Sequence, residues 1–412
     1  MNKQDDDTDL IPRLFRQQYS KMTAVLCRHF GLQHIQVAED IVSDTFLKAS
    51  EHWAINGVPD KPEAWLYAVA KNKTRDYFKH KSIFETKIKG NLDTENSEPE
   101  IQFEYSENGI ADSQLLMIFA VCNPEISMEA QICLALQILC GFGIEEIANA
   151  FITNKETIKK RLHRAKAKLR NDKFQITNLC KTQISSRMDT VLKTLYLLFN
   201  EGYYSKSDDR KIRKELCQEA IRLALVLVEN KQTDLPQVNA LLAMMCFQSS
   251  RLEARQSATG DTILFEDQDR TLWDQSIINR GNYFLIKSTE DKVISRYHLE
   301  AGIAYWHTTE SPKKWKYILD LYDQLLLIEY APITALNRTF AYAKVYGSEN
   351  AIAELEKRDL VRNEYYYMLL GNLYATSDIP RAVQHYQLAL ELSKSANEKE
   401  MIEKQIKNLS KP

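Results

Sequence analysis

The chain has 412 residues and carries 54 Lys and Arg against 56 Asp and Glu, which gives a formal net charge of −2. This length allows two to four domains that each bury a hydrophobic core. The near balance of charge excludes a uniformly basic or acidic protein, so any nucleic-acid partner has to be recognised by a local concentration of charge. With 12 Gly and 10 Pro, and without alternating strands and hairpin turns, the sequence predicts an all-α fold.

The motifs of common catalytic sites are missing. There is no phosphate-binding glycine loop, no HExxH motif and no Ser-His-Asp arrangement, so we expect neither an enzyme nor a cofactor. The seven cysteines form no CxxC pair, which predicts buried, reduced thiols and no metal site. The acidic N-terminus precedes no hydrophobic run and the apolar runs are short, so we expect a cytoplasmic protein with no membrane contact. Three neighbouring acids are expected to cap helices and form ion pairs, namely Glu266, Asp267 and Asp269.

Residues 10–82 predict a first helical domain. One helix begins near His34, a loop with Gly57 and Pro62 follows, and the next helix, Trp65 to Lys81, mixes aromatic and basic residues. Aromatic faces and basic side chains together bind the bases and backbone of single-stranded nucleic acids. The alternative is that the aromatic residues form the core of a helical bundle, which leaves the basic residues as the better functional candidates.

Residues 83–111 carry many acids and few aliphatic side chains, which predicts a flexible acidic linker. A second helical domain is predicted at residues 112–172. Two modules on such a tether could bind two separated DNA sites more tightly than either module alone.

The second domain ends in the most basic segment, Lys155 to Arg170, which holds eight Lys and Arg against one acid. Its apolar residues recur at helical spacing and predict one buried stripe, formed by Ile158, Leu162, Ala165 and Leu169. A shorter amphipathic helix, Gly143 to Phe151, precedes it, and Asn154 is a natural N-cap. This outline is typical of a helix-turn-helix whose second helix enters a major groove. The alternative is a solvated charged helix. The candidate DNA-binding residues are Lys155, Thr157, Lys159, Lys160, Arg161, Arg164 and Lys168.

The remaining sequence predicts a helical extension at 185–290 and helical repeats at 291–410. The best match to a tetratricopeptide repeat is Tyr367 to Leu390. The residues that match the repeat pattern on the first helix are Tyr367, Leu370, Gly371 and Tyr374. Those that match it on the second helix are Ala382, Tyr386 and Ala389. Ordinary helical hairpins also place small residues where helices cross.

Taken in order, these segments resemble a bacterial sigma factor of the sigma-70 type. The resemblance is closest to the compact extracytoplasmic-function class, which has only regions two and four. The segment Ala38 to Ala49 resembles the helix that docks on core RNA polymerase, which implies polymerase-binding roles for Asp40, Ile41, Asp44 and Phe46. The segment Pro62 to Lys81 resembles the part that melts and reads the −10 element, which implies roles there for Trp53, Asn56, Trp65, Lys71, Asn72, Lys73 and Arg75.

Residues 112–170 resemble region four, which reads the −35 element through its helix-turn-helix. The C-terminal half is similar to a subgroup with a long tetratricopeptide-like extension that regulates the sigma factor. The resemblance therefore implies a sigma factor whose partners are core RNA polymerase and promoter DNA. It also implies that the extension contacts either another protein or the rest of the chain. Two alternatives remain: a helix-turn-helix regulator with a repeat sensor that never acts as a sigma subunit, and a scaffold that uses its repeats for protein partners.

Overall fold

The structure is a computed structural model that describes residues 10–89, 106–151, 153–172, 174, 176, 180–204, 210–255, 263–290, 293–358, 360–393 and 396–409. Every regular element among these residues is a helix, so the prediction of an all-α fold is confirmed. The chain forms two compact units, one up to Leu198 and the other from Phe199 onward.

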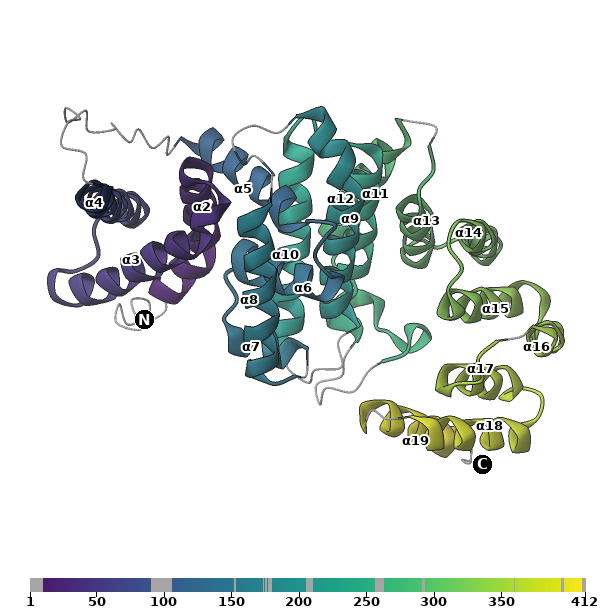
Figure 1. Cartoon of the computed structure of the whole chain (residues 1–412). Coiled ribbons are helices and arrows are strands. Elements are labelled where there is room, and N and C mark those ends of the chain that lie inside the picture. The colour runs from purple at the N-terminus through teal and green to yellow at the C-terminus, as the bar shows by residue number, and fades with distance from the viewer. Residues whose placement is uncertain are drawn as a thin grey trace. The chain divides into compact units, whose positions relative to one another are not determined.

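The first unit opens with three helices, α2 (Leu10–Phe30), α3 (Ile35–Asn56) and α4 (Pro62–Lys89), with a short 3-10 turn, η1 (Leu32–His34), between the first two (Figure 1). α2 ends at Gly31, whose N–H still donates to the Cys27 carbonyl at 2.8 Å and whose φ of 84° then turns the chain out of the helix. α3 ends in the same way at Gly57, with φ 78° and a 3.0 Å bond to the Trp53 carbonyl. These two turns fold the three helices against each other.

The rest of the first unit consists of α5 (Glu107–Val121), α6 (Met128–Leu134), a π-helical turn η2 (Ala135–Leu139), α7 (Ile144–Ala150), α8 (Lys155–Asn171) and the start of α9 (Lys181–Tyr203). α5 packs along α2, so the two predicted domains contact each other within this unit. Both ends of the predicted linker are helical, because residues 83–89 continue α4 and residues 107–111 begin α5. Residues 90–105 of that linker lie outside the described residues.

The second unit contains α10 (Arg210–Glu229), α11 (Pro236–Ser249), three 3-10 turns, η3 (Glu253–Arg255), η4 (Phe265–Asp267) and η5 (Arg270–Leu272), then α12 (Gln275–Lys287) and η6 (Ser288–Glu290). α11 is its central helix, since every residue from Val238 to Phe247 is at most 2% exposed. α12 packs closely on it because Gly281 has no side chain. A Cβ at that position would lie 2.8 Å from the Phe247 ring.

Seven further helices follow in the second unit, each packed on the next (Figure 1). They are α13 (Arg296–Thr308), α14 (Lys314–Ile328), α15 (Pro332–Tyr346), α16 (Ser348–Lys357), α17 (Glu364–Tyr374), α18 (Ile379–Leu392) and α19 (Ala396–Leu409). The best repeat match falls on α17 and α18. Gly371 of α17 lies against the ring of Tyr386 of α18, and Ala382 and Ala389 are completely buried beside it. Small residues therefore stand where these two helices cross closely.

Six of the seven cysteines are buried, as the sequence predicts, and Cys180 is exposed, which the prediction missed. Among the described residues, no helix has both the length and the apolar character that a membrane crossing requires. The same residues contain no group of three or more His, Cys, Asp or Glu side chains arranged to hold a metal ion.

Candidate nucleic-acid interface

α8 has one buried stripe and one basic face. Asn154 caps its first turn by accepting a 2.7 Å hydrogen bond from the Thr157 backbone N–H, as the sequence predicts. The buried stripe is formed by Ile158, Leu162, Ala165 and Leu169, all at most 3% exposed. This stripe packs on α6 and α7. α7 is fixed at its own start by Glu146, which accepts from the Gly143 N–H at 2.7 Å. The opposite face of α8 is therefore free to carry charge.

The candidate DNA-binding residues of α8 differ in exposure. Thr157 and Arg161 are half-buried, and Arg161 places Nη1 3.8 Å from the sulfur of Cys133 in α6. The others are exposed, namely Lys155, Lys159, Lys160, Arg164 and Lys168.

Three of the exposed side chains have local partners. Lys155 pairs with Glu145 of α7 at 2.8 Å, and Lys159 pairs with Glu156 at the same distance. Lys168 donates to the carbonyl of Glu125 at 2.5 Å. Such exposed contacts are worth about 0–1 kcal/mol, so a phosphate can replace them. Among the described residues, Lys160 and Arg164 have no acidic partner, and His163, which sequence reasoning missed, is exposed between them.

Lys166 points away from this face toward α3. Its Nζ lies 2.7 and 2.8 Å from the two carboxylate oxygens of Glu39, and both side chains are largely buried. Burial raises the pKa of the Glu39 carboxyl, and the charge of Lys166 opposes that rise. Tyr19 of α2 adds a 3.4 Å hydrogen bond to the same carboxylate. A charged contact therefore joins the basic helix to the first three helices, and nothing in the sequence pattern distinguishes Lys166 from its neighbours.

Two further contacts hold the same surfaces together. Arg16 of α2 pairs with Glu146 of α7 at 2.7 Å and lies over the Phe142 ring. Arg28 of α2 donates to the Gly109 carbonyl of α5 at 3.2 Å. The two helical domains of the first unit are therefore packed together by ionic and polar contacts from three sides of α2 and α3.

The predicted single-strand surface lies mainly on α4. Lys71, Asn72 and Arg75 are exposed, whereas Lys73 is half-buried and lies 3.5 Å from Asp44 of α3. Asn56 is exposed at the end of α3 and donates to the His52 carbonyl.

The two tryptophans of this set are packed against each other. Trp53 is 5% exposed, and its ring centroid lies 5.3 Å from that of the half-buried Trp65. Protein therefore covers most of the Trp53 ring, and its role at the −10 element stays a prediction. Its ring fills the space between α3 and α4, so it belongs to the core that the alternative interpretation expected.

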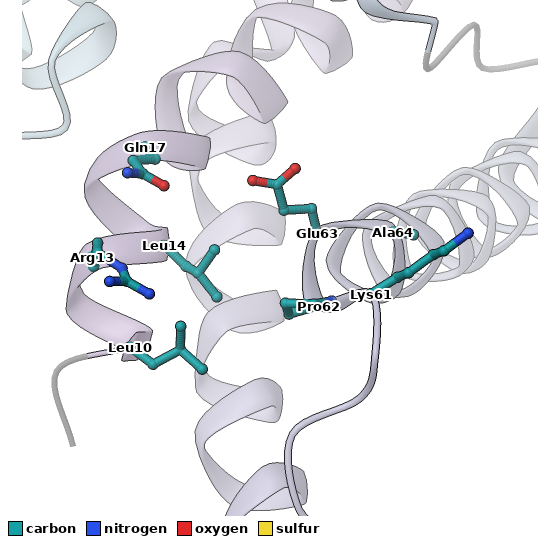
Figure 2. A pocket seen from close by; sticks show the side chains of 8 residues that line it. All are labelled: Leu10, Arg13, Leu14, Gln17, Lys61, Pro62, Glu63 and Ala64. Atoms are coloured by element: carbon teal, nitrogen blue, oxygen red, sulfur yellow. The ribbon is translucent and has the colours of Figure 1, made fainter. Parts of the chain in front are cut away.

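Exposed apolar side chains stand beside this surface, and the sequence analysis did not select them. Ile55 is 84% exposed at the end of α3, and Val58 is 39% exposed in the following loop. The loop then leads to an open depression of about 620 Å³ between the first turns of α2 and α4. Figure 2 shows Arg13 and Gln17 on one wall, with Lys61 and Glu63 on the other. Gln18 donates to Glu63 at 2.7 Å and so ties the two helices together.

The residues implied in polymerase binding divide into two faces of α3. Asp40 and Asp44 are exposed, together with Leu47, which is 60% exposed and was not predicted. Ile41 and Phe46 are 8% and 5% exposed, and Phe46 packs on the Phe15 ring of α2 at 5.0 Å. Their side chains therefore form part of the core of the first domain, and a polymerase-binding role for these two residues stays a prediction.

Comparisons with known proteins cover most of the chain. Residues 14–83 match sigma-70 region 2, and residues 187–289 match a family of unknown function (DUF6596). An uncharacterized protein of Rhizobium meliloti (strain 1021) is 30% identical over 397 residues, which is 93% of this chain and 92% of that protein. No solved structure matched the chain.

Proposed function

Because the chain belongs to one family with the Rhizobium meliloti protein and begins with a region 2 of the sigma-70 family, we propose that it is a sigma factor. It binds core RNA polymerase and directs promoter-specific initiation, and its C-terminal helices regulate that activity. The observation that carries the proposal is the order of two basic surfaces along one chain. A region 2 with a basic α4 is followed by α8, whose apolar stripe is buried and whose basic face is open.

The basic face of α8 fits the −35 element. α7, a short turn and α8 form the helix-turn-helix of this proposal, and Lys160 and Arg164 are its most available cations. Arg can pair bidentately with guanine in the major groove, whereas Lys more often holds a phosphate. Lys155, Lys159 and Lys168 exchange their weak surface contacts for phosphates. Arg161, half-buried against α6, contributes positive charge from the rim of the surface.

The exposed residues of α4 fit the −10 element. Lys71 and Arg75 follow the phosphates of the opened strand, and Asn72 lies between them. Ile55 is an exposed apolar side chain at the end of α3, suited to contact a base step that has been unstacked. The depression between α2 and α4 offers Gln17 and Arg13 as polar groups for a flipped base. The loop that contains Val58 connects these two features.

Core polymerase docks on the exposed face of α3 in this proposal. Asp40 and Asp44 provide the charge, and Leu47 provides an apolar anchor between them and the end of the helix. Because Lys73 already pairs with Asp44, polymerase binding would free this lysine for DNA.

The packing within the first unit explains why promoter binding would have to be regulated. The −10 and −35 elements are centred about 25 base pairs apart, or about 85 Å of B-DNA. α8 is only about 25 Å long, and it is bonded to α3 through Lys166 and Glu39. The two DNA-binding surfaces therefore have to separate before both elements can be bound together. We assign to the C-terminal helices the role of controlling that change.

Run-off transcription tests the proposal directly. Purified core RNA polymerase is supplied with a pool of promoters from the source genome, with and without the full-length protein. New start sites that require the protein are the expected result, and their upstream sequences give both promoter elements. A truncated chain that ends after residue 204 keeps α9, because Arg187 pairs with Asp172 and Thr194 bonds Gln131 within the first unit. Equal output from both chains would rule out a regulatory C-terminal part.

The other candidate is a DNA-binding regulator that never serves as a sigma subunit. The basic face of α8 is compatible with it, but region 2 and the exposed face of α3 would then have no role. Salt-sensitive binding to duplex DNA without any new start site, also for the truncated chain, would favour this regulator.

A further inference from the structure

Two arginines of the second unit, the buried Arg251 and the half-buried Arg255, have no acidic partner among the described residues. Arg251 follows the end of α11 and is only 8% exposed. Its Nη2 donates to the Tyr203 hydroxyl at 3.1 Å, while its buried Nε–H has no partner. Arg255 lies four residues further on, in η3, and its buried Nη1 also lacks a partner. Among the described residues, no carboxylate pairs with either guanidinium.

Arg338 of α15 is a buried arginine of the same unit that does have acidic partners. It is 9% exposed, close to the value for Arg251, but it bonds Asp323 at 2.8 Å and pairs with Glu354 as well. A buried charge that is neither paired nor fully hydrogen-bonded costs several kcal/mol. The contrast identifies Arg251 as a cation whose counter-charge is missing.

Aromatic rings account for the position of the two arginines but not for their free N–H groups. The Cζ of Arg255 lies 3.7 Å from the Tyr203 ring centroid, and that of Arg251 lies 5.1 and 5.9 Å from the centroids of Phe265 and Trp273. Such stacking is worth about 0.5–2 kcal/mol and leaves the edge of the guanidinium unused. The Nε1–H of Trp273 is also buried without a partner. The unpartnered buried groups of this cluster therefore include N–H donors of Arg251, Arg255 and Trp273, besides the Nδ1 atom of His307.

The surroundings add positive charge. Lys314 lies 5.8 Å from the Phe265 ring, and burial, together with Arg270, lowers its pKa. His307 packs on the same ring at 4.7 Å. Burial, with Arg251 and Lys314 nearby, lowers the pKa of His307 to about 3, so its imidazole is neutral near pH 7 and adds no further positive charge.

Two acids of the neighbouring segments already have basic partners. Glu266 pairs with Lys344 at 2.5 Å, and Glu310 pairs with Arg270. Burial alone raises the pKa of Glu201, so no cation holds that carboxyl in its charged form. The charge inside the ring cluster is therefore positive and unbalanced among the described residues.

We propose that this cluster binds a small anion through carboxylate or phosphate oxygens, with Arg251 and Arg255 as its charged ligands and Trp273 as a further donor. Unpartnered N–H donors from two arginines fit an oxyanion, and arginine is the side chain best suited to bind one through several hydrogen bonds. The proposal does not depend on the sigma-factor function. If that function holds, the anion is a ligand through which the C-terminal helices respond to the cell's metabolic state.

Calorimetric titration of the full-length protein tests the site. Inorganic phosphate, pyrophosphate and citrate serve as probes, each compared with sodium chloride at equal ionic strength. We expect saturable binding of at least one probe, and the preferred probe distinguishes a phosphate ligand from a carboxylate ligand. Arg251→Met and Arg255→Met should each weaken that binding at least tenfold. Arg362→Met, which removes an exposed arginine of the same unit, should leave it unchanged.

Trp273→Phe separates binding from folding. This variant keeps a stacking ring and removes only an N–H that has no partner, so circular dichroism and thermal unfolding should match the parent while binding weakens several-fold. Absence of saturable binding for all three probes would overturn the proposal. Equal binding by the parent and Arg251→Met would overturn it as well. Asp208, Asp209 and Asp261 lie outside the described residues. If replacing them with Asn creates binding that the parent lacks, a carboxylate of the chain itself is the counter-charge, and the proposal fails.

Discussion

Lys166 of α8 and Glu39 of α3 form a nearly buried ion pair, with Nζ 2.7 and 2.8 Å from the two carboxylate oxygens. The pair joins the proposed −35 helix to the proposed polymerase-binding helix. Removing one partner of a buried pair leaves an uncompensated charge and costs about 3–5 kcal/mol, whereas replacing both partners by apolar residues is often neutral. The pair is therefore a point at which the closed arrangement of the first unit can be opened or restored by mutation.

Lys166→Met should open the first unit. The lone Glu39 carboxylate regains water only if α3 and α8 separate, so dyes placed on α4 and α8 should move apart. Energy transfer between them measures this change. Glu39→Leu combined with Lys166→Met should restore the short distance, and Lys168→Met, an exposed change on the same helix, should not alter it. An unchanged dye distance in Lys166→Met would show that the pair does not hold the two domains together.

Replacing Lys160 and Arg164 by Ala should weaken promoter binding. Each lost phosphate contact should reduce the slope of log affinity against log salt by about 0.9, and a lost guanine contact should cost about 1–3 kcal/mol at one base pair only. Fluorescence anisotropy with a duplex −35 site, repeated at several salt concentrations, gives both quantities.

Two further variants test whether the loss of promoter binding is specific to Lys160 and Arg164. Lys181→Ala removes an exposed lysine at the start of α9 and should leave both quantities unchanged. Arg161→Ala combined with Arg164→Ala compares the half-buried arginine with the exposed one, and we expect most of the effect from Arg164 because Arg161 is half-buried. If the Lys160 and Arg164 double variant keeps full promoter affinity, α8 is not part of the DNA interface.

Gly371→Ala should destabilise the second unit. The new Cβ would lie 2.8 Å from the ring carbons of Tyr386, which is itself buried, so α17 and α18 would have to move apart. Overpacking of this kind costs about 1–3 kcal/mol. Urea unfolding followed by circular dichroism measures the loss. Gln384→Ala, an exposed change on α18, should stay within about 0.5 kcal/mol of the parent. Unaltered stability in Gly371→Ala would mean that this crossing is loosely packed.

Helical periodicity was enough to predict the local features of α8. The buried stripe, the Asn154 cap and the basic face all follow from spacing within one helix. Periodicity could not select Lys166 from the other basic residues, because its partner lies 127 positions away in the sequence. The family resemblance implied polymerase-binding roles for Ile41 and Phe46, and it could not show that both side chains are buried. A family motif marks the helix that carries a function, but the packing of neighbouring helices decides which of its side chains are exposed.

The arginine cluster of the second unit could not have been predicted from spacing either. Arg251, Trp273 and His307 come from three separate elements, and only the fold brings them together. The acids in the same segment were correctly expected to cap helices and form ion pairs. Asp269 caps η5 by accepting from Thr271, and Glu266 pairs with Lys344. Sequence alone could not indicate that Arg251 has no acidic partner among the described residues and donates to the Tyr203 hydroxyl instead.

The buried imidazole of His307 should make α13 sensitive to acid. Its pKa is lowered to about 3 by burial and by the nearby charges of Arg251 and Lys314. The unfolded chain, with an ordinary histidine pKa near 6.5, therefore binds more protons between about pH 3 and 6.5, and stability falls as the pH drops through that window. Between pH 7.5 and pH 5 the loss should be about 2 kcal/mol.

Hydrogen exchange of the α13 amides at several pH values, converted to opening free energies, measures this loss. His307→Phe keeps an aromatic ring between Phe265 and Trp315 and should remove the acid-dependent part. His163→Gln, at an exposed position of α8, should retain the full dependence of the parent. The same pH slope in His307→Phe and in the parent would assign the acid sensitivity to other groups. If the pH slope disappears in His307→Phe, the acid sensitivity comes from the His307 imidazole, whose pKa is lowered by burial and by the charges of Arg251 and Lys314.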